Sequence, residues 1–150
     1  MSAMLVLAGV AVCMMSGLPA LAGRRWSAAT TPLILLGAAT GFVGSALGLI
    51  DPTSNLALPW QVPGGAVALR VDALSAFFAA PVFLLAGAGG LYAERYWPAT
   101  RARSGYVRAF FGVMTGALAL VMCAANTMLF LAAWEIVAVA SFFLIATEHE

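Results

Sequence analysis

The sequence predicts an all-α integral membrane protein with five transmembrane helices, and three observations predict it: the composition, the apolar segments and the arginine distribution. Of the 150 residues, 63% are hydrophobic and 9% are charged, whereas soluble domains have about 45–50% and about 25%. So few charges cannot cover a surface in water, so the lipid bilayer is the expected solvent. The seven arginines and six acidic residues nearly cancel, which leaves no basic field to attract nucleic acid.

Five apolar segments have about the length of 20 residues that a membrane-spanning helix needs. Their expected bounds are about 2–22, 32–50, 73–92, 107–125 and 127–146. Little of the chain then remains outside the bilayer, so we expect residues 1–150 to form a single membrane domain. Small residues four apart, such as Gly37 and Gly41 or Gly112 and Gly116, predict close packing between these helices.

The first apolar segment has an alternative interpretation as a signal peptide, because residues 18–22 resemble a cleavage site of small residues. A signal peptide begins with a positively charged region. No arginine or lysine precedes Arg24 in this sequence. We therefore expect a retained membrane helix.

The arginines predict the orientation of the helices. If the helices alternate in direction, six of the seven arginines fall on one side and only Arg70 falls on the other. The arginine-rich side is then cytoplasmic, with the N-terminus outside and the C-terminus in the cytoplasm. Trp26, Trp60 and Trp97 fall near the predicted interfaces, where tryptophan is favoured. Arg108 is expected to extend to the cytoplasmic interface.

The loop after the second helix has a pattern of its own. Two short alternating stretches, 58–62 and 66–70, flank Pro63-Gly64-Gly65, which is typical of a β-hairpin. We expect a short hairpin in this outer loop, with an irregular loop as the alternative.

Helix caps can also be read from the sequence. Asp72 precedes the third helix, where its carboxylate is expected to cap the helix N-terminus. Asn126 or Thr127 is expected to cap the fifth helix.

Glu135 is the residue most strongly marked for function. It is the ninth residue of the last segment, roughly 12 Å along a span of about 30 Å, and therefore near the bilayer midplane. A carboxylate there costs at least ~2.5 kcal/mol, so it must be protonated, paired with another helix or open to water. Trp134 is expected to pack beside it. A neutral glutamate with a purely structural role is the alternative.

Other candidate residues are few. His149 is a second titratable candidate, near the C-terminal end, with simple solvation as the alternative. Cys13 and Cys123 lie far apart in apolar segments and have no metal-binding spacing. No nucleophile, nucleotide or zinc motif occurs, so we expect no cofactor, no metal and no redox site in this chain.

Three segments resemble the antiporter-like, proton-conducting subunits of complex I and of group 4 membrane hydrogenases. They are LRVDALSAFF at 69–78, NTMLFLAAWE at 126–135 and SFFLI at 141–145. The outer hairpin and the Glu148-His149-Glu150 ending are most similar to the hydrogenase-4 and formate hydrogenlyase type.

The resemblance implies a bacterial inner-membrane subunit that moves protons while electron transfer occurs elsewhere in the complex. Glu135 matches the family's glutamate, and Arg70, Asp72 and Trp134 take structural or interface positions. The implied partners are other membrane subunits and a peripheral hydrogenase or dehydrogenase arm. The family also uses lysines on later helices, whereas this chain has no lysine. We therefore expect an N-terminal fragment of a longer subunit.

Several alternatives remain at the level of sequence. The chain is also compatible with a subunit of a multisubunit cation/proton antiporter. A small multidrug-type exporter is disfavoured, because such exporters resemble four-helix chains with the glutamate in the first helix. A non-catalytic membrane scaffold is the last alternative.

Overall fold

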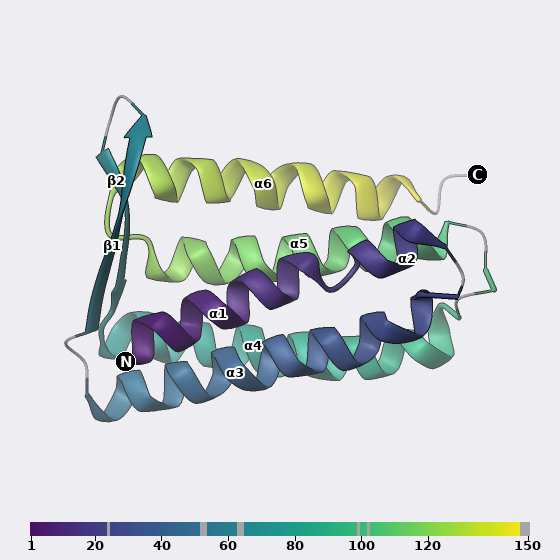
Figure 1. Ribbon diagram of the computed structural model, residues 1–150, viewed down its shortest axis with the longest axis horizontal. Helices are drawn as coiled ribbons and strands as arrows, with labels where there is room; N and C mark the ends of the chain where they lie inside the picture. The colour runs from purple at the N-terminus through teal and green to yellow at the C-terminus, as the bar shows by residue number, and fades with distance from the viewer. Residues whose placement is uncertain (24, 52–53, 63–64, 99, 102, 148–150) are drawn as a thin grey trace.

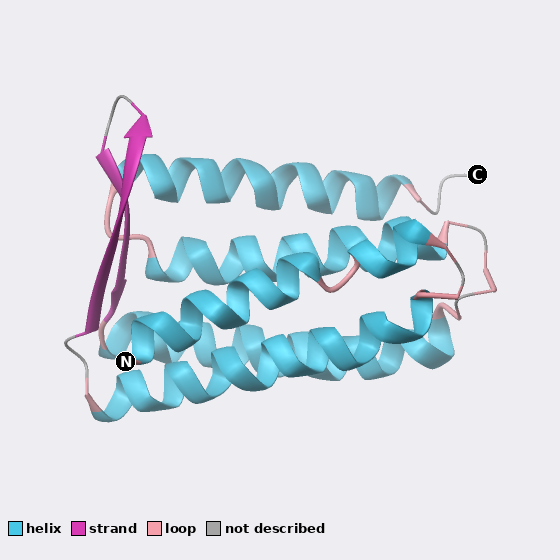
Figure 2. Ribbon diagram, viewed as in Figure 1, coloured by secondary structure: helices cyan, strands magenta, loops and turns pink. Residues whose placement is uncertain are grey.

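The computed structural model describes the chain except residues 24, 52–53, 63–64, 99, 102 and 148–150, and for 59–62 and 65–66 only the backbone. The described residues form an elongated helical bundle with a β-ribbon across one end (Figures 1 and 2). The helices are α1 Ser2–Met15, α2 Leu18–Ala22, the 3-10 helix η1 Ser27–Ala29, α3 Thr30–Ile50, α4 Ala73–Tyr96, α5 Ser104–Cys123 and α6 Thr127–Ala146. The strands are β1 Ser54–Val62 and β2 Gly65–Val71.

The first predicted helix is broken, which corrects the expectation of one helix over 2–22. Between α1 and α2, the backbone N–H and the hydroxyl of Ser16 both donate to the Cys13 carbonyl, at 3.1 and 2.7 Å. Pro19 lies in the first turn of α2, where it has no N–H to continue the helix of the preceding turn. α1 and α2 together still have the length and hydropathy of a membrane span.

α1 packs between α3 and α5 (Figure 1). Glycines make this close approach possible, as the spacing of small residues predicted. A Cβ atom added to Gly9 would lie 2.6 Å from the Gly41 Cα atom, and one added to Gly112 would lie 2.4 Å from the Cys13 carbonyl oxygen. Any larger residue at these positions would force the helices apart.

The other helices differ from their predicted bounds mainly at the arginine-rich end. α3 begins at Thr30 rather than 32, α4 continues to Tyr96 rather than 92, and α5 begins at Ser104 rather than 107. α6 has the predicted bounds. These extensions carry polar side chains of α3, α4 and α5 to the same end of the bundle.

Two of the predicted caps are confirmed. Asp72 accepts a hydrogen bond from the Ser75 backbone N–H at 2.8 Å at the start of α4. Asn126 accepts one from the Leu129 N–H, also at 2.8 Å, at the start of α6. The caps satisfy backbone donors that the first turn of a helix leaves unpaired.

β1 and β2 pair antiparallel, with Ser54 opposite Val71. Leu69 and Val71 of β2 are almost fully buried, and the Ala68 carbonyl accepts a hydrogen bond from the Ala125 N–H at 2.8 Å. The ribbon is thus joined to the short connection between α5 and α6. It covers the end of the bundle that holds the N-terminus (Figure 1).

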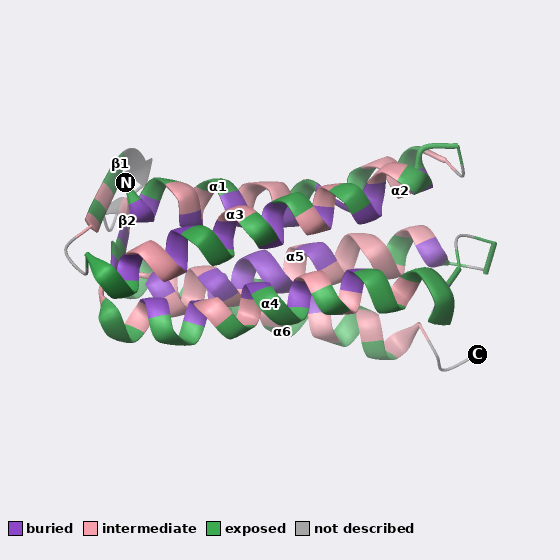
Figure 3. Cartoon of the chain, turned by 90° about the horizontal axis from the view of Figure 1, so that it is seen from below, coloured by how far each residue is buried: buried purple, intermediate pink, exposed green. Residues whose placement is uncertain are grey.

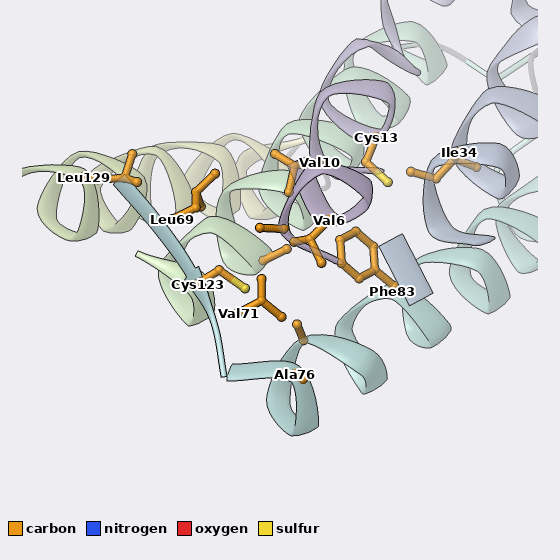
Figure 4. Close-up of a cluster of buried hydrophobic side chains, with 13 residues drawn as sticks. Val6, Val10, Cys13, Ile34, Leu69, Val71, Ala76, Phe83, Cys123 and Leu129 are labelled. Atoms are coloured by element: carbon orange, nitrogen blue, oxygen red, sulfur yellow. The ribbon is translucent and has the colours of Figure 1, made fainter. Parts of the chain in front are cut away.

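The core lies where α1, α3, α4, α5 and β2 meet. Figure 4 shows Phe83 of α4 directed toward Val6 of α1, with Val71 and Cys123 nearby. Cys13 and Cys123 are both buried and unbonded to each other, which agrees with their expected role as small core residues.

α6 is the most weakly buried of the long helices. It lies at the edge of the bundle beside α5 (Figure 1), and only Leu129, Ala133 and Ala140 along it are buried. Figure 3 shows the exposed and intermediate stretches along it in green and pink. α5 and α6 pack side by side in opposite directions, and most of the remaining surface of α6 is open.

Candidate functional site

Glu135 lies midway along α6, on the open part of that helix. The helix is apolar, and the hydroxyl of Ser141, a polar side chain in its second half, donates to the Val137 carbonyl at 2.7 Å. That hydroxyl therefore has its proton committed to the helix backbone. Glu135 is left as the titratable group in the middle of the helix.

A groove between α5 and α6 contains the Glu135 side chain. Its other lining residues are all apolar: Phe110, Val113, Ala132, Ile136, Val139 and Ala140. Its volume is about 380 Å³. The carboxyl group thus lies on an apolar surface. The other residues that line the groove offer no polar side chain to either its protonated or its ionised form.

Among the residues that the structure describes, none forms a hydrogen bond or an ion pair with Glu135. The sequence allowed three states for Glu135: protonated, paired with another helix, or open to water. Pairing with a described residue of this bundle is therefore excluded. The remaining states are a protonated carboxyl and a carboxylate whose partner or water lies beyond these helices. Either state makes Glu135 sensitive to whatever covers the groove.

Trp134 does not pack into the bundle. Its side chain is 59% exposed, and its ring contacts Phe130 one turn earlier, with centroids 5.6 Å apart. The expectation that Trp134 packs beside Glu135 is therefore replaced by packing along its own helix. Trp134 and Glu135 follow one another in the chain, and both are exposed on α6.

Arg70 and Asp72 lie at the ribbon end, where β2 leads into α4. The Arg70 Nε atom donates to Asn55 Oδ1 across the ribbon at 3.4 Å. The backbone N–H and the hydroxyl of Ser75 donate to Asp72, and these hydrogen bonds hold the pKa of Asp72 below its usual value. Their observed contacts are structural. His149 lies outside the described residues.

A second polar cluster occupies the opposite end, and sequence reasoning missed it. Arg108 does not extend to the interface as expected, because its side chain is only 9% exposed. Its Nη1 atom donates to Thr30 Oγ1 at 2.7 Å and to Thr31 Oγ1 at 3.3 Å. Glu94 Oε1 lies 3.7 Å from the same nitrogen and accepts a hydrogen bond from the Thr31 hydroxyl.

The extended helix ends explain this Arg108 cluster. The additional turn of α4 carries Glu94, and the earlier start of α3 carries Thr30 and Thr31, so both meet Arg108 in the second turn of α5. A signal was present in the sequence, because all four side chains border the same predicted membrane face. The cluster was missed because each residue was considered separately, by its position along the chain.

Trp97 belongs to the same region and also departs from its expected place. The sequence placed its ring among lipid headgroups, whereas the side chain is buried, at 7% exposure. Arg101 lies over the ring, 3.6 Å from the centroid. By contrast, Trp26 is exposed at this end, and the Trp60 side chain lies outside the described residues.

Metal chemistry finds no support in the described part of the chain. No three His, Cys, Asp or Glu side chains within it come together as a metal site.

The fold and these sites define the class as a multi-pass α-helical membrane protein. Within the described part of the chain, five segments are long and apolar enough to cross a membrane: Ser2–Ala22, Ser27–Ile50, Ala73–Tyr96, Ser104–Cys123 and Thr127–Ala146.

The chain is similar to two proteins of Mycobacterium tuberculosis. The chain is 33% identical over 104 residues to the uncharacterized protein Rv0083 of strain ATCC 25618 / H37Rv and to the uncharacterized protein MT0090 of strain CDC 1551 / Oshkosh. The aligned region is 69% of this chain but only 16% of each relative. No family model matches the chain, and no solved structure matches it.

Proposed function

We propose that this chain is a proton-translocating, antiporter-like subunit of a membrane-bound complex of the hydrogenase-4, formate hydrogenlyase or NADH dehydrogenase type. The observation that carries the proposal is Glu135, a carboxyl group that has no partner among the described residues and lies in the middle of a spanning helix, in an apolar groove. An ionisable side chain at that depth is costly and marks a proton path more often than a packing site.

Glu135 works in this proposal as a site that loads and releases one proton. An apolar covering favours the protonated carboxyl, and a nearby cation favours the carboxylate. A cation that approaches and withdraws would therefore drive proton release and uptake in turn. The electron transfer that powers this movement takes place in another subunit, since no redox group is expected in this chain.

The cation belongs to helices that cover the groove between α5 and α6. This chain has no lysine, and the described arginines lie at the helix ends or on β2 rather than beside Glu135. We propose that further membrane helices supply it, as lysine-bearing helices do in the family that the sequence resembles. The chain spans only 16% of the length of its mycobacterial relatives.

The proposed setting is the bacterial inner membrane, with the N-terminus outside and the C-terminus in the cytoplasm. Arg25, Arg95, Arg101 and Arg103 lie in or beside the connections at one end of the bundle, whereas Arg70 lies on the ribbon at the other end (Figure 1). The positive-inside rule supports this orientation, and the β-ribbon then lies on the outer surface.

The test is proton translocation per electron pair in the assembled complex. Glu135→Gln keeps the size and polarity of the side chain but removes its titration, so coupling should be lost while assembly is retained. Glu135→Asp should keep part of the coupling. Ser141→Ala is the matched control, because it removes a polar group of the same helix that has no titratable proton, and it should pump normally.

Normal pumping by an assembled Glu135→Gln complex would refute the proposal and leave Glu135 as a packing residue. If proton movement depends on Glu135 but is coupled to sodium transport rather than to electron transfer, the subunit belongs to a multisubunit cation/proton antiporter.

A further inference from the structure

We propose that the outer surface of the arginine-rich end selects anionic phospholipids from the bilayer. The surface is formed by Arg25, Arg95 and Arg101, whose side chains are all exposed. Arg25 lies in the connection between α2 and η1, Arg95 in the last turn of α4, and Arg101 in the connection between α4 and α5. These segments lie together at one end of the bundle (Figure 1). The inference does not depend on proton transport or on the role of Glu135.

None of these three arginines has a carboxylate partner among the described residues. Of the described acids, Glu94 is the one at this end, and it belongs to the Arg108 cluster. Its Oε1 atom lies 3.7 Å from Arg108 Nη1 and accepts a hydrogen bond from the Thr31 hydroxyl. Glu148 and Glu150 lie outside the described residues. The exposed arginines therefore carry positive charge that the described residues do not neutralise, and this charge complements an anionic headgroup.

Aromatic side chains place this surface at the level of the headgroups. The three tyrosines of the chain, Tyr92, Tyr96 and Tyr106, are all exposed. They lie near the end of α4 and at the start of α5, at the same end of the bundle as the arginines. Trp26, which is also exposed, follows Arg25 in the chain. Tyrosine and tryptophan are enriched where a bilayer meets water, so the arginines among them can reach the phosphates of surrounding lipids.

Arg101 is held against the end of the bundle. Its guanidinium carbon lies 3.6 Å from the centroid of the Trp97 ring, and that ring is buried. The Arg101 side chain remains exposed and donates no hydrogen bond to a described residue. Its planar set of N–H donors is thus positioned at the rim of the bundle, where it can bind the oxygens of a phosphate.

These positions favour a lipid over an acidic protein domain as the partner. Arg95 directly precedes Tyr96 in the last turn of α4, and Arg101 lies on Trp97. Both charges therefore stay close to the helix ends instead of extending away from the bilayer. Basic residues just beyond a membrane helix attract anionic lipids, and each one near the surface raises the affinity about fivefold.

The test is lipid binding to the full chain, purified in an uncharged detergent and analysed by native mass spectrometry. Phosphatidylglycerol and phosphatidylcholine with the same acyl chains are titrated in separately. We expect phosphatidylglycerol, which has a net negative charge, to bind about tenfold more tightly. Raising the ionic strength from about 0.1 to about 1 M shortens the Debye length from about 10 to about 3 Å, so it should reduce this preference.

The decisive variant combines Arg95→Gln with Arg101→Gln, and it should lower the preference for phosphatidylglycerol by about fivefold or more. Arg101→Lys keeps the charge and should keep the preference within about twofold, which separates the effect of charge from that of packing on Trp97. Arg70→Gln is the matched control, because it removes an exposed arginine at the opposite end. It should also leave the preference within about twofold of the wild type, since its charge lies far beyond a Debye length from this surface.

Equal binding of the two lipids by the wild type overturns the proposal and leaves the surface to an acidic protein partner. A preference that persists in the double variant also overturns it. An equal loss in Arg70→Gln would do the same, because the selection would then follow the total charge of the chain rather than this surface.

Discussion

The two polar sites of this chain differ in where their partners lie. Arg108 is held inside the bundle by two threonines and Glu94, which come from two other helices. Glu135 lies at the edge of the same bundle and has no partner among the described residues. The Arg108 cluster is formed entirely by residues of this chain, whereas the groove that holds Glu135 is open on the surface of the bundle. The contrast separates a group that maintains the fold from a group that is available for function.

The largest expected effect concerns transport by this chain alone. Reconstituted in liposomes by itself, the chain should show no proton flux above that of empty vesicles, because no described arginine lies beside Glu135. Proton flux is measured with a pH-sensitive dye after a potassium gradient is imposed. A strong flux that Glu135→Gln abolishes would show that the open site is complete after all, and would favour a small autonomous exporter.

The two ends of the bundle should also differ in accessibility. In a variant that lacks Cys13 and Cys123, a cysteine at Asn55 on the ribbon should react with an impermeant thiol reagent from outside intact cells. A cysteine at Thr100, between α4 and α5, should react only after the membrane is opened. Both positions lie on exposed residues. The reverse pattern would place the Arg108 end outside and contradict the proposed orientation.

Substitutions at Arg108 and at Glu135 should have different effects on the free energy of unfolding. Arg108→Gln removes hydrogen bonds from a charged, buried donor, so the free energy of unfolding should fall by about 2 kcal/mol. Glu135→Gln removes no contact within the bundle and should leave stability unchanged or raise it slightly. Both values come from unfolding by sodium dodecyl sulfate in mixed micelles. A similar loss in both variants would mean that Glu135 has a partner inside the fold.

The smallest expected effect is at Asp72, a structural carboxylate that contrasts with Glu135. Asp72→Ala should cost about 1 kcal/mol through loss of the helix cap, whereas Asp72→Asn should keep the cap. Since the hydrogen bonds of Ser75 lower the pKa of Asp72 in the folded state, its ionisation stabilises the fold above the ordinary pKa. That contribution disappears as the pH falls through the lowered value.

Unfolding measured at pH 7 and at about pH 3 provides the check on Asp72. The wild type should lose a small part of its stability at the lower pH, and Asp72→Asn should lose less. Identical pH dependence in the two proteins would show that the cap does not depend on charge.

Local sequence patterns determined much of the fold. Long apolar segments predicted five spans, the spacing of Gly37 and Gly41 predicted a close helix contact, and Asp72 and Asn126 predicted caps. Each of these follows from residues near one another in the chain, since hydrophobic length, small-residue spacing and capping act within one or two turns. The position of Glu135 along α6 was available in the same way, because depth in a span follows from residue count.

Only the tertiary structure decided which polar groups have partners. Arg108 and Trp97 were each expected at the interface, yet both turn inward, because the ends of α3, α4 and α5 extend beyond their apolar segments and meet there. The two threonine partners of Arg108 are 77 and 78 residues away in the chain, a separation that no local pattern encodes. Likewise, the residue count placed Glu135 midway along α6, but the face it occupies depends on which side of α6 packs against α5. Whether a charged side chain in a membrane protein has a partner depends on its neighbours in space, and helix packing determines which residues those neighbours are.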